Sequence, residues 1–404
     1  MFRSLQYRNY RLFFTGQSIS LIGTWMQRVA ISWLVYRLTG SPFILGLITF
    51  ASLIPSLFLA PFAGSFVDRH NKFKTFCFTQ VLLMIQAGTL ALMVWFDYYD
   101  IFWIGVLSLL QGIVTSLDVT ARQSLVVNLV GKKEDIPNAI ALNSSVFNGA
   151  RLIGPAVAGI ILSSFGEKIC FLINFVSYLA VLICLSQMRL KVPPTPKRRE
   201  NIWFDLKEGF HYLKDSPNIS SLILVMASSS LLVIPFTTFL PVFAKDIFHG
   251  DATTFSWFES CGGLGALVGA VYMATLKSHR NFNQIIIQSG FALGISVFAL
   301  ALAPTLIVAL FFTAAAAMAL MAQNSSINTY LQTHTSDKMR GRTMSYYIMA
   351  FQGILPLGTL LMGFLAHRFG TTYIVAFEGL AGILIMLSFM LYRKNRIREA
   401  KART

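Results

Sequence analysis

Runs of about twenty apolar residues recur along the whole chain and are separated by short polar segments. A run of that length, wound as an α-helix, crosses a hydrocarbon core of roughly 30 Å. We therefore expect an all-α polytopic membrane protein. The pattern predicts twelve spanning helices, at 12–35, 44–67, 75–96, 102–127, 139–164, 169–188, 219–243, 255–276, 285–303, 306–331, 344–365 and 373–392.

The composition agrees with a membrane protein and argues against other classes. Of 404 residues, 55% are hydrophobic and only 12% are charged, about half the share in soluble domains. The composition therefore argues against a soluble enzyme, a disordered chain, a disulfide scaffold and a nucleic-acid binder. The four cysteines are scattered within apolar spans without CxxC spacing, and the six histidines fall in loops or at span ends. We expect no disulfide framework, metal site or cofactor.

Basic residues are distributed unevenly between the two sides of this topology. The formal net charge is +16, from 33 basic and 17 acidic residues. With the N-terminus placed inside, 27 basic residues fall on that side and 4 on the other. The asymmetry follows the positive-inside rule and predicts that both termini are cytoplasmic. Topology and anionic lipid headgroups thus account for the positive charge.

A basic segment at 189–218 separates two sets of six spans, and within it 204–214 predicts a short amphipathic helix on the membrane surface. The two halves are weakly similar, because 149–159 aligns with 353–363 at an offset of 204 residues. Such a repeat indicates two related bundles with a binding site near the midplane between them. The predicted domains are a first bundle at 1–188, the linker at 189–218, a second bundle at 219–392 and a basic tail at 393–404.

Two loop and helix motifs carry a resemblance to a known family. The segment 64–74, GSFVDRHNKFK, is similar to the GxxxD[RK]xxR[RK] loop of the major facilitator superfamily, and 149–159 is similar to the Gly-Pro motif of its antiporters. The stretches 7–27 and 32–46 resemble bacterial exporters grouped around the enterobactin exporter, with macrolide-efflux relatives. This resemblance implies two six-helix bundles that export a small molecule by alternating access, in the bacterial inner membrane.

The resemblance also implies a cytoplasmic latch between the loop after the second span and neighbouring helices. Its predicted members are Gly64, Asp68, Arg69, Lys72, Asp118 and Arg122, together with the start of the eleventh span. The alternative is that these charges only anchor the topology. The sequence departs from the family at Ser108, where an arginine usually precedes Gln-Gly, and the second-half copy of the loop motif has no aspartate.

Two arginines fall near mid-depth in the spans that border the central cavity in this superfamily. Neither Arg28 nor Arg151 has a carboxylate three or four residues away. Because guanidinium groups bind carboxylates in a bidentate manner, the pair favours an anionic substrate. The alternative is an interhelical ion pair with Glu259 or Glu378. A charge at membrane depth needs a partner or water in either case.

Other polar residues inside the spans complete the candidate set. Proton coupling is predicted for Asp118, Glu259 and Glu378. Substrate contacts are predicted for Arg28, Arg151, Gln27, Trp25, Gln111, Asn148, Gln323 and Gln352. Singly, each amide could equally be an interhelical hydrogen bonder. Close helix packing is predicted for Gly149, Gly154, Pro155 and Gly159.

These observations predict a monomeric secondary active exporter. Its expected partners are its small-molecule substrate, membrane lipids and protons, the last through proton antiport. No Walker-type GxxxxGK[ST] sequence is present, so ATP is not expected as the direct energy source, and no enzymatic constellation is apparent. The anionic substrate class, siderophore-like, is favoured. Hydrophobic drug or macrolide efflux, and lipid or lysophospholipid translocation on the same fold, are the alternatives.

Overall fold

The computed structural model describes residues 3–188, 202–275, 282–336 and 339–403, and within these ranges all regular secondary structure is helical. Ten segments of the described chain are long and apolar enough to cross a membrane. Two further long helices, α1 and α10, occupy the first and eighth predicted spans. The chain is therefore a multi-pass membrane protein, and the twelve-helix prediction is confirmed.

The first six spans are unbroken helices that match the predicted ranges to within a few residues. They are α1 (Arg8–Thr39), α2 (Pro42–Arg69), α3 (Lys72–Trp95), α4 (Ile101–Val126), α5 (Ile136–Phe165) and α6 (Glu167–Ser186). Local chemistry sets the boundaries. The Ser41 hydroxyl accepts from the backbone N–H of Ile44 at the start of α2, and Asp100 accepts from that of Phe102 at the start of α4. Gly40 ends α1 in the left-handed conformation, with φ of 57°.

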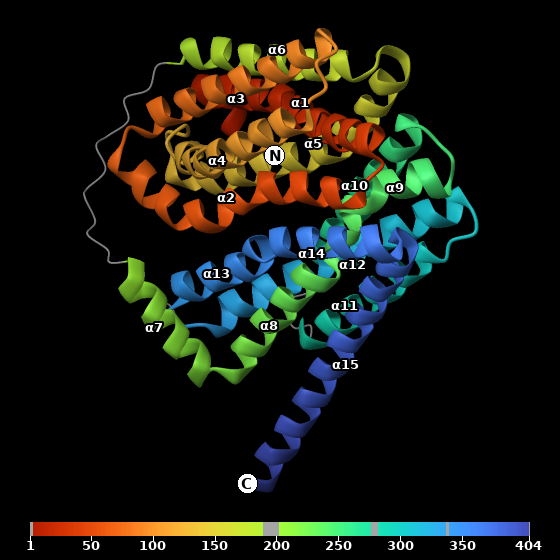
Figure 1. Ribbon diagram of the computed structural model, residues 1–404. Coiled ribbons are helices and arrows are strands. Elements are labelled where there is room, and N and C mark those ends of the chain that lie inside the picture. Colours follow the sequence, from red (N-terminus) through yellow and green to blue (C-terminus); the bar gives the residue numbers. More distant parts are fainter. Residues whose placement is uncertain (1–2, 189–201, 276–281, 337–338, 404) are drawn as a thin grey trace. The chain divides into compact units, whose positions relative to one another are not determined.

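These helices pack against neighbours that are mostly not adjacent in the sequence. α1 lies along α5 and α6, α2 lies along α4, and α3 contacts both α4 and α6 (Figure 1). Two ion pairs tie the ends of α1, α3 and α6 together, Arg37 with Glu167 at 2.9 Å and Lys168 with Asp97 at 3.0 Å. Lys168 beside Asp97 holds the pKa of that exposed carboxyl below its usual value.

Contacts between Cα atoms divide the chain into two compact units. The first contains Met1–Arg199 and Pro241–Ser260, and the second contains Glu200–Leu240 and Cys261–Thr404. The segment Pro241–Ser260 thus packs with the first six helices: the rings of Trp33 and Phe255 stack with centroids 6.3 Å apart, and the Tyr36 hydroxyl donates to Asp246. The partition into transport domains at 1–188 and 219–392 stays a prediction.

The remaining α-helices of the described chain, of which the first lies within the linker, are α7 (Ile202–Asp215), α8 (Pro217–Leu232), α9 (Leu240–Val242), α10 (Ala252–Thr275), α11 (Phe282–Ala301), α12 (Leu306–His334), α13 (Arg340–Ile348), α14 (Leu355–Phe369) and α15 (Thr371–Arg403). α15 runs as one continuous helix toward the C-terminus (Figure 1). α7 confirms the helix predicted at 204–214. The basic stretch 189–201, which the sequence assigns to the linker, lies outside the described residues.

Two predicted spans are interrupted, which the apolar pattern did not indicate. The seventh changes from α8 to a 3-10 segment, Ile234–Phe239, and ends in a π-helical turn, Phe243–Ile247. The eleventh carries a π-helical turn, Met349–Gly353, between α13 and α14. Pro235 and Pro356 lie at these breaks, and proline removes the N–H that would continue the α-helical ladder.

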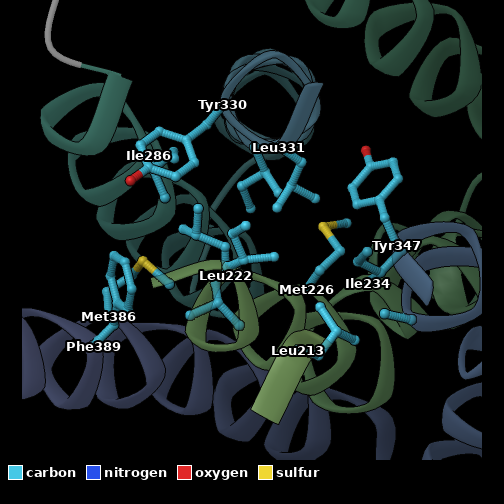
Figure 2. Close-up of a cluster of buried hydrophobic side chains, with 14 residues drawn as sticks. Leu213, Leu222, Met226, Ile234, Ile286, Tyr330, Leu331, Tyr347, Met386 and Phe389 are labelled. Atoms are coloured by element: carbon cyan, nitrogen blue, oxygen red, sulfur yellow. The ribbon is translucent and has the colours of Figure 1, made fainter. Parts of the chain in front are cut away.

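The core of the second unit draws on helices that are distant in sequence. Figure 2 shows Leu213 of α7, Leu222 and Met226 of α8, and Met386 and Phe389 of α15 as members of one apolar cluster. α7 is further fixed by an ion pair between Glu208 and Arg342 of α13, at 3.0 Å. The amphipathic helix of the linker is therefore docked by one face on the second unit.

Candidate functional site

The centre of the candidate site is the indole ring of Trp25 on α1. The guanidinium carbon of Arg28 lies 5.1 Å from the ring centroid, and that of Arg151 on α5 lies 5.8 Å from it. Trp25 and Arg28 are three residues apart and so share a helix face. Each cation–π contact contributes about 0.5–1 kcal/mol, or more where water is excluded. The two arginines predicted from the sequence are thus brought together by one aromatic ring.

Close approach of α5 to α1 explains how Arg151 reaches that ring. A Cβ atom built on Gly154 would lie 2.5 Å from the Cβ of Trp25 and 3.1 Å from the carbonyl oxygen of Ile22. Only a residue without a side chain fits such a contact. Arg151 is almost one turn before Gly154 on the same helix, so the glycine contact sets the depth at which the guanidinium meets the indole.

The same motif contacts a second helix further along α5. A Cβ atom on Gly159 would lie 2.5 Å from the Cβ of Ser256, in the first turns of α10. Gly149 has open space, with no atom within 4 Å of a built Cβ. Pro155 is buried inside α5. The predicted packing stripe therefore has two tight contacts and one open position.

Glu259 is the acidic group of this cluster. It lies on α10 nearly one turn after Ser256, in the part of that helix that belongs to the first unit. Its carboxyl interacts electrostatically with both Arg28 and Arg151, and the two arginines interact with one another. Among the described residues, the ion pairs closer than 4 Å do not include Glu259 with either arginine. One acid facing two guanidinium groups leaves the cluster with a net positive charge.

Gln27, although adjacent to Arg28 in sequence, lies in a different network inside the first unit. It is fully buried, its carbonyl accepts from the Asn174 side-chain amide at 2.7 Å, and its own amide donates to Gln86 at 3.1 Å. This chain of amides joins α1, α6 and α3. The geometry places Gln27 in bundle packing and apart from the arginine cluster. Neither Gln86 nor Asn174 was among the predicted site residues.

Asp118 and Arg122 are both buried on α4 but have different partners. One oxygen of Asp118 accepts from the Thr79 hydroxyl at 2.8 Å and from the Gln80 side-chain amide at 2.7 Å. Arg122 donates to the side-chain carbonyl of Gln17 on α1 at 3.4 Å. Within the described chain, ion pairs at 4 Å or less do not join Asp118 to Arg122. Thr79 and Gln80 were not among the predicted site residues, although polar residues inside an apolar span were a signal for them.

The latch residues are only partly described. Gly64 lies in α2, with open space around a built Cβ, Arg69 ends the helix and is exposed, and Lys72 begins α3. The side chain of Asp68 lies outside the described residues. The latch therefore stays a prediction.

The remaining amides are dispersed. Gln111 is half-buried on α4, and the Asn148 amide donates to the carbonyl of Ser144 on its own helix at 2.9 Å. Gln323 and Gln352 belong to the second unit. Gln323 is buried with its amide 3.7 Å from the Met386 sulfur, whereas Gln352 is exposed in the π-helical turn of the eleventh span.

Glu378, also in the second unit, is the fully buried acid of α15. Its exposed fraction is zero, and neither carboxyl oxygen has a hydrogen-bond partner in the described structure. The sequence allowed Glu378 to form an ion pair with Arg28 or Arg151. Among the described contacts, the acid that interacts with both arginines is Glu259.

Comparison with known proteins places these features in a family. The sequence profile of a family described as transmembrane secretion effectors matches residues 1–404. The chain belongs to this family. The family is a branch of the major facilitator superfamily, so the resemblance to that superfamily noted in the sequence is confirmed.

Individual relatives of this family member are distant but cover almost its whole length. The staphyloferrin A transporter of Staphylococcus aureus is 25% identical over 96% of this chain and 97% of its own. Macrolide efflux protein A of Streptococcus pyogenes is 22% identical over 98% of both. A crystal structure of a bacterial homologue of the iron transporter ferroportin has a TM-score of 0.72 at 16% identity, covering 95% of this chain and 98% of that one. That likeness concerns the fold.

Proposed function

We propose that this protein exports a small organic anion from the cytoplasm of a bacterium, as a monomer with both termini inside. Family membership supports transport, and the two relatives named above are a siderophore transporter and a drug-efflux protein. The observation that carries the substrate class is that Arg28 and Arg151 both contact the indole ring of Trp25. Alternating access with proton antiport is part of the proposal.

Electrostatics favours an anion at this cluster over a neutral or cationic compound. Two guanidinium groups face one carboxyl, that of Glu259, so a bound carboxylate relieves the repulsion between the arginines. Each guanidinium offers paired N–H donors that match a carboxylate, and a charge-assisted hydrogen bond contributes about 1.5–3 kcal/mol. Arg28 is exposed and Arg151 is half-buried, so both can be reached by a ligand.

Thermal unfolding of the purified protein tests the substrate class directly. Citrate and its neutral triethyl ester are suitable probes because they differ mainly in charge. A ligand at a hundredfold excess over its Kd stabilises the folded state by about 2.7 kcal/mol. We expect stabilisation by citrate and none by the ester. Equal stabilisation by both compounds, or by neither while the macrolide erythromycin stabilises, would contradict the anionic site.

Substitution of the arginines separates ligand binding from structural pairing. In Arg28→Gln and Arg151→Gln, citrate affinity should fall roughly ten- to a hundredfold, the equivalent of one lost charge-assisted contact. Combining each with Glu259→Gln completes a double-mutant cycle. Coupling seen in the unfolding midpoint, with citrate affinity unchanged, would assign the arginines to an ion-pair role and remove the reason for an anionic substrate.

Efflux of a large apolar compound is the second candidate, and one contact favours it. Phe147 packs edge-on against Trp25 with ring centroids 5.9 Å apart, and it is 40% exposed. Aromatic walls of this kind bind apolar ligands. Erythromycin is the matching probe. Stabilisation by erythromycin that survives in the Arg28→Gln, Arg151→Gln double variant would favour this function over anion export.

A further inference from the structure

Glu378 occupies an apolar environment made by tightly packed helices. Val375 and Ala381, which share its side of α15, are buried to 0% and 6% exposure. One residue further along, a Cβ on Gly379 would lie 2.4 Å from the backbone nitrogen of Phe298 on α11. The helices thus meet backbone to backbone beside the acid, and the carboxyl is shielded from water.

Among the described residues of the helices packed around it, this carboxyl has no charged partner. α15 packs against α11, α8, the 3-10 segment Ile234–Phe239 and α14. The first three contain no titratable residue. In α14 the titratable residues are His367 and Arg368, both in its last turn. Within the membrane-spanning interior of the described second unit, Glu378 is therefore an isolated acid.

The three candidate acids differ in which protonation state their surroundings suit. Burial disfavours the charged form at all three sites, but Asp118 accepts two hydrogen bonds and Glu259 faces two guanidinium groups, and these partners offset part of that cost. Glu378 has neither kind of partner. The effective penalty for burying an unpaired charge is several kcal/mol, whereas a neutral carboxyl requires only one donor and one acceptor to be desolvated. The neutral form is the one that this environment accommodates.

We propose that Glu378 is the proton-carrying group of the transporter, protonated while buried between α15 and its neighbours and deprotonated when these helices separate and admit water. This inference rests on the proposed antiport function and narrows it to one of three acids. The anion cluster lies in the first unit and Glu378 lies in the second. Proton and anion would then be coupled through the conformational change, without competing for one carboxyl.

Infrared spectroscopy of the purified protein tests the protonation state without any substrate. A buried neutral carboxyl gives a C=O stretching band that an ionised carboxylate lacks. We expect such a band at neutral pH in the wild type, in Asp118→Asn and in Glu259→Gln, and its loss in Glu378→Gln. A band that persists in Glu378→Gln, or that disappears in either of the other two variants, would overturn the assignment.

Vesicle transport tests the coupling role, with citrate as the probe anion. Glu378→Gln should abolish citrate uptake driven by an imposed ΔpH into inside-out vesicles but retain citrate counterflow, because only the proton step is lost. Glu378→Asp should keep the ΔpH response. Uptake by Glu378→Gln that still follows ΔpH would refute the proposal.

A matched control removes another buried group without a partner. The Ser230 hydroxyl is fully buried and unpaired but does not titrate in this range. Ser230→Ala should keep both the infrared band and ΔpH-driven uptake, and loss of either would assign the Glu378 effects to packing. If the wild type shows the Glu378 band but transports no citrate, the choice of anion in the proposed function fails and the protonated acid stands.

Discussion

Alanine substitution of the glycines in α5 gives a graded test of the site's architecture. Gly154 is the contact that seats α5 on Trp25, whereas Gly149, on the same helix, has open space around it. In both variants, replacing glycine by alanine gains up to about 1 kcal/mol of helix propensity. That gain cancels when the two variants are compared.

The difference in unfolding free energy between Gly154→Ala and Gly149→Ala therefore measures the cost of the steric overlap at Gly154. A Cβ atom 2.5 Å from the Trp25 Cβ forces the helices apart, and overpacking of this kind costs about 1–3 kcal/mol. We expect Gly154→Ala to unfold at a lower temperature than Gly149→Ala by the equivalent of that amount. Trp25 fluorescence should change in the former only.

Thermal unfolding in detergent, followed by intrinsic fluorescence and by size-exclusion chromatography, measures both effects. Gly159→Ala, which meets Ser256 at 2.5 Å, should behave like Gly154→Ala in stability. Equal midpoints for Gly154→Ala and Gly149→Ala would show that both positions tolerate a methyl group equally and that Gly154 is not a tight contact between α5 and α1.

Two further predictions concern the polar interior and the loop motif. Gln27→Leu leaves the side-chain amides of Asn174 and Gln86 without their partner, and each loss should cost about 1–3 kcal/mol of stability. The unfolding midpoint should fall accordingly, and an unchanged midpoint would argue against the amide chain. Asp68→Asn should insert and fold normally but export slowly, because the predicted latch loses its acid; wild-type transport at equal expression would contradict the latch.

The sequence predicted the number and limits of the spans well because each depends on local properties. The length of each apolar run determines the extent of the helices α2 to α6. The capping residues Ser41 and Asp100 place the starts of α2 and α4 within two residues of the predicted limits. The breaks at Ile234–Phe239 and Met349–Gly353 were not predicted. A proline inside an apolar run signals a possible irregularity, but Pro155 sits in an unbroken α5, so proline alone does not decide the outcome.

The sequence predicted which residues could form the candidate site but not which of them contact one another. Arginines within spans pointed to Arg28 and Arg151, and their meeting on Trp25 depends on the register between α1 and α5, which the glycine contact sets in three dimensions. Sequence could not decide which acids have partners. Only tertiary packing distinguishes Glu259, beside two guanidinium groups, from Glu378, whose carboxyl has none.

Metabolite profiling tests the central claim, export of an organic anion through the arginine cluster, most directly. Cells that express the wild type, the Arg28→Gln, Arg151→Gln double variant or no transporter would be compared for compounds in the medium and in the cytoplasm. We expect at least one carboxylate-bearing metabolite to be enriched in the medium only with the wild type and to be retained inside the cells otherwise. Export that depends on the protein but concerns only neutral or cationic compounds, or that continues unchanged in the double variant, would contradict it.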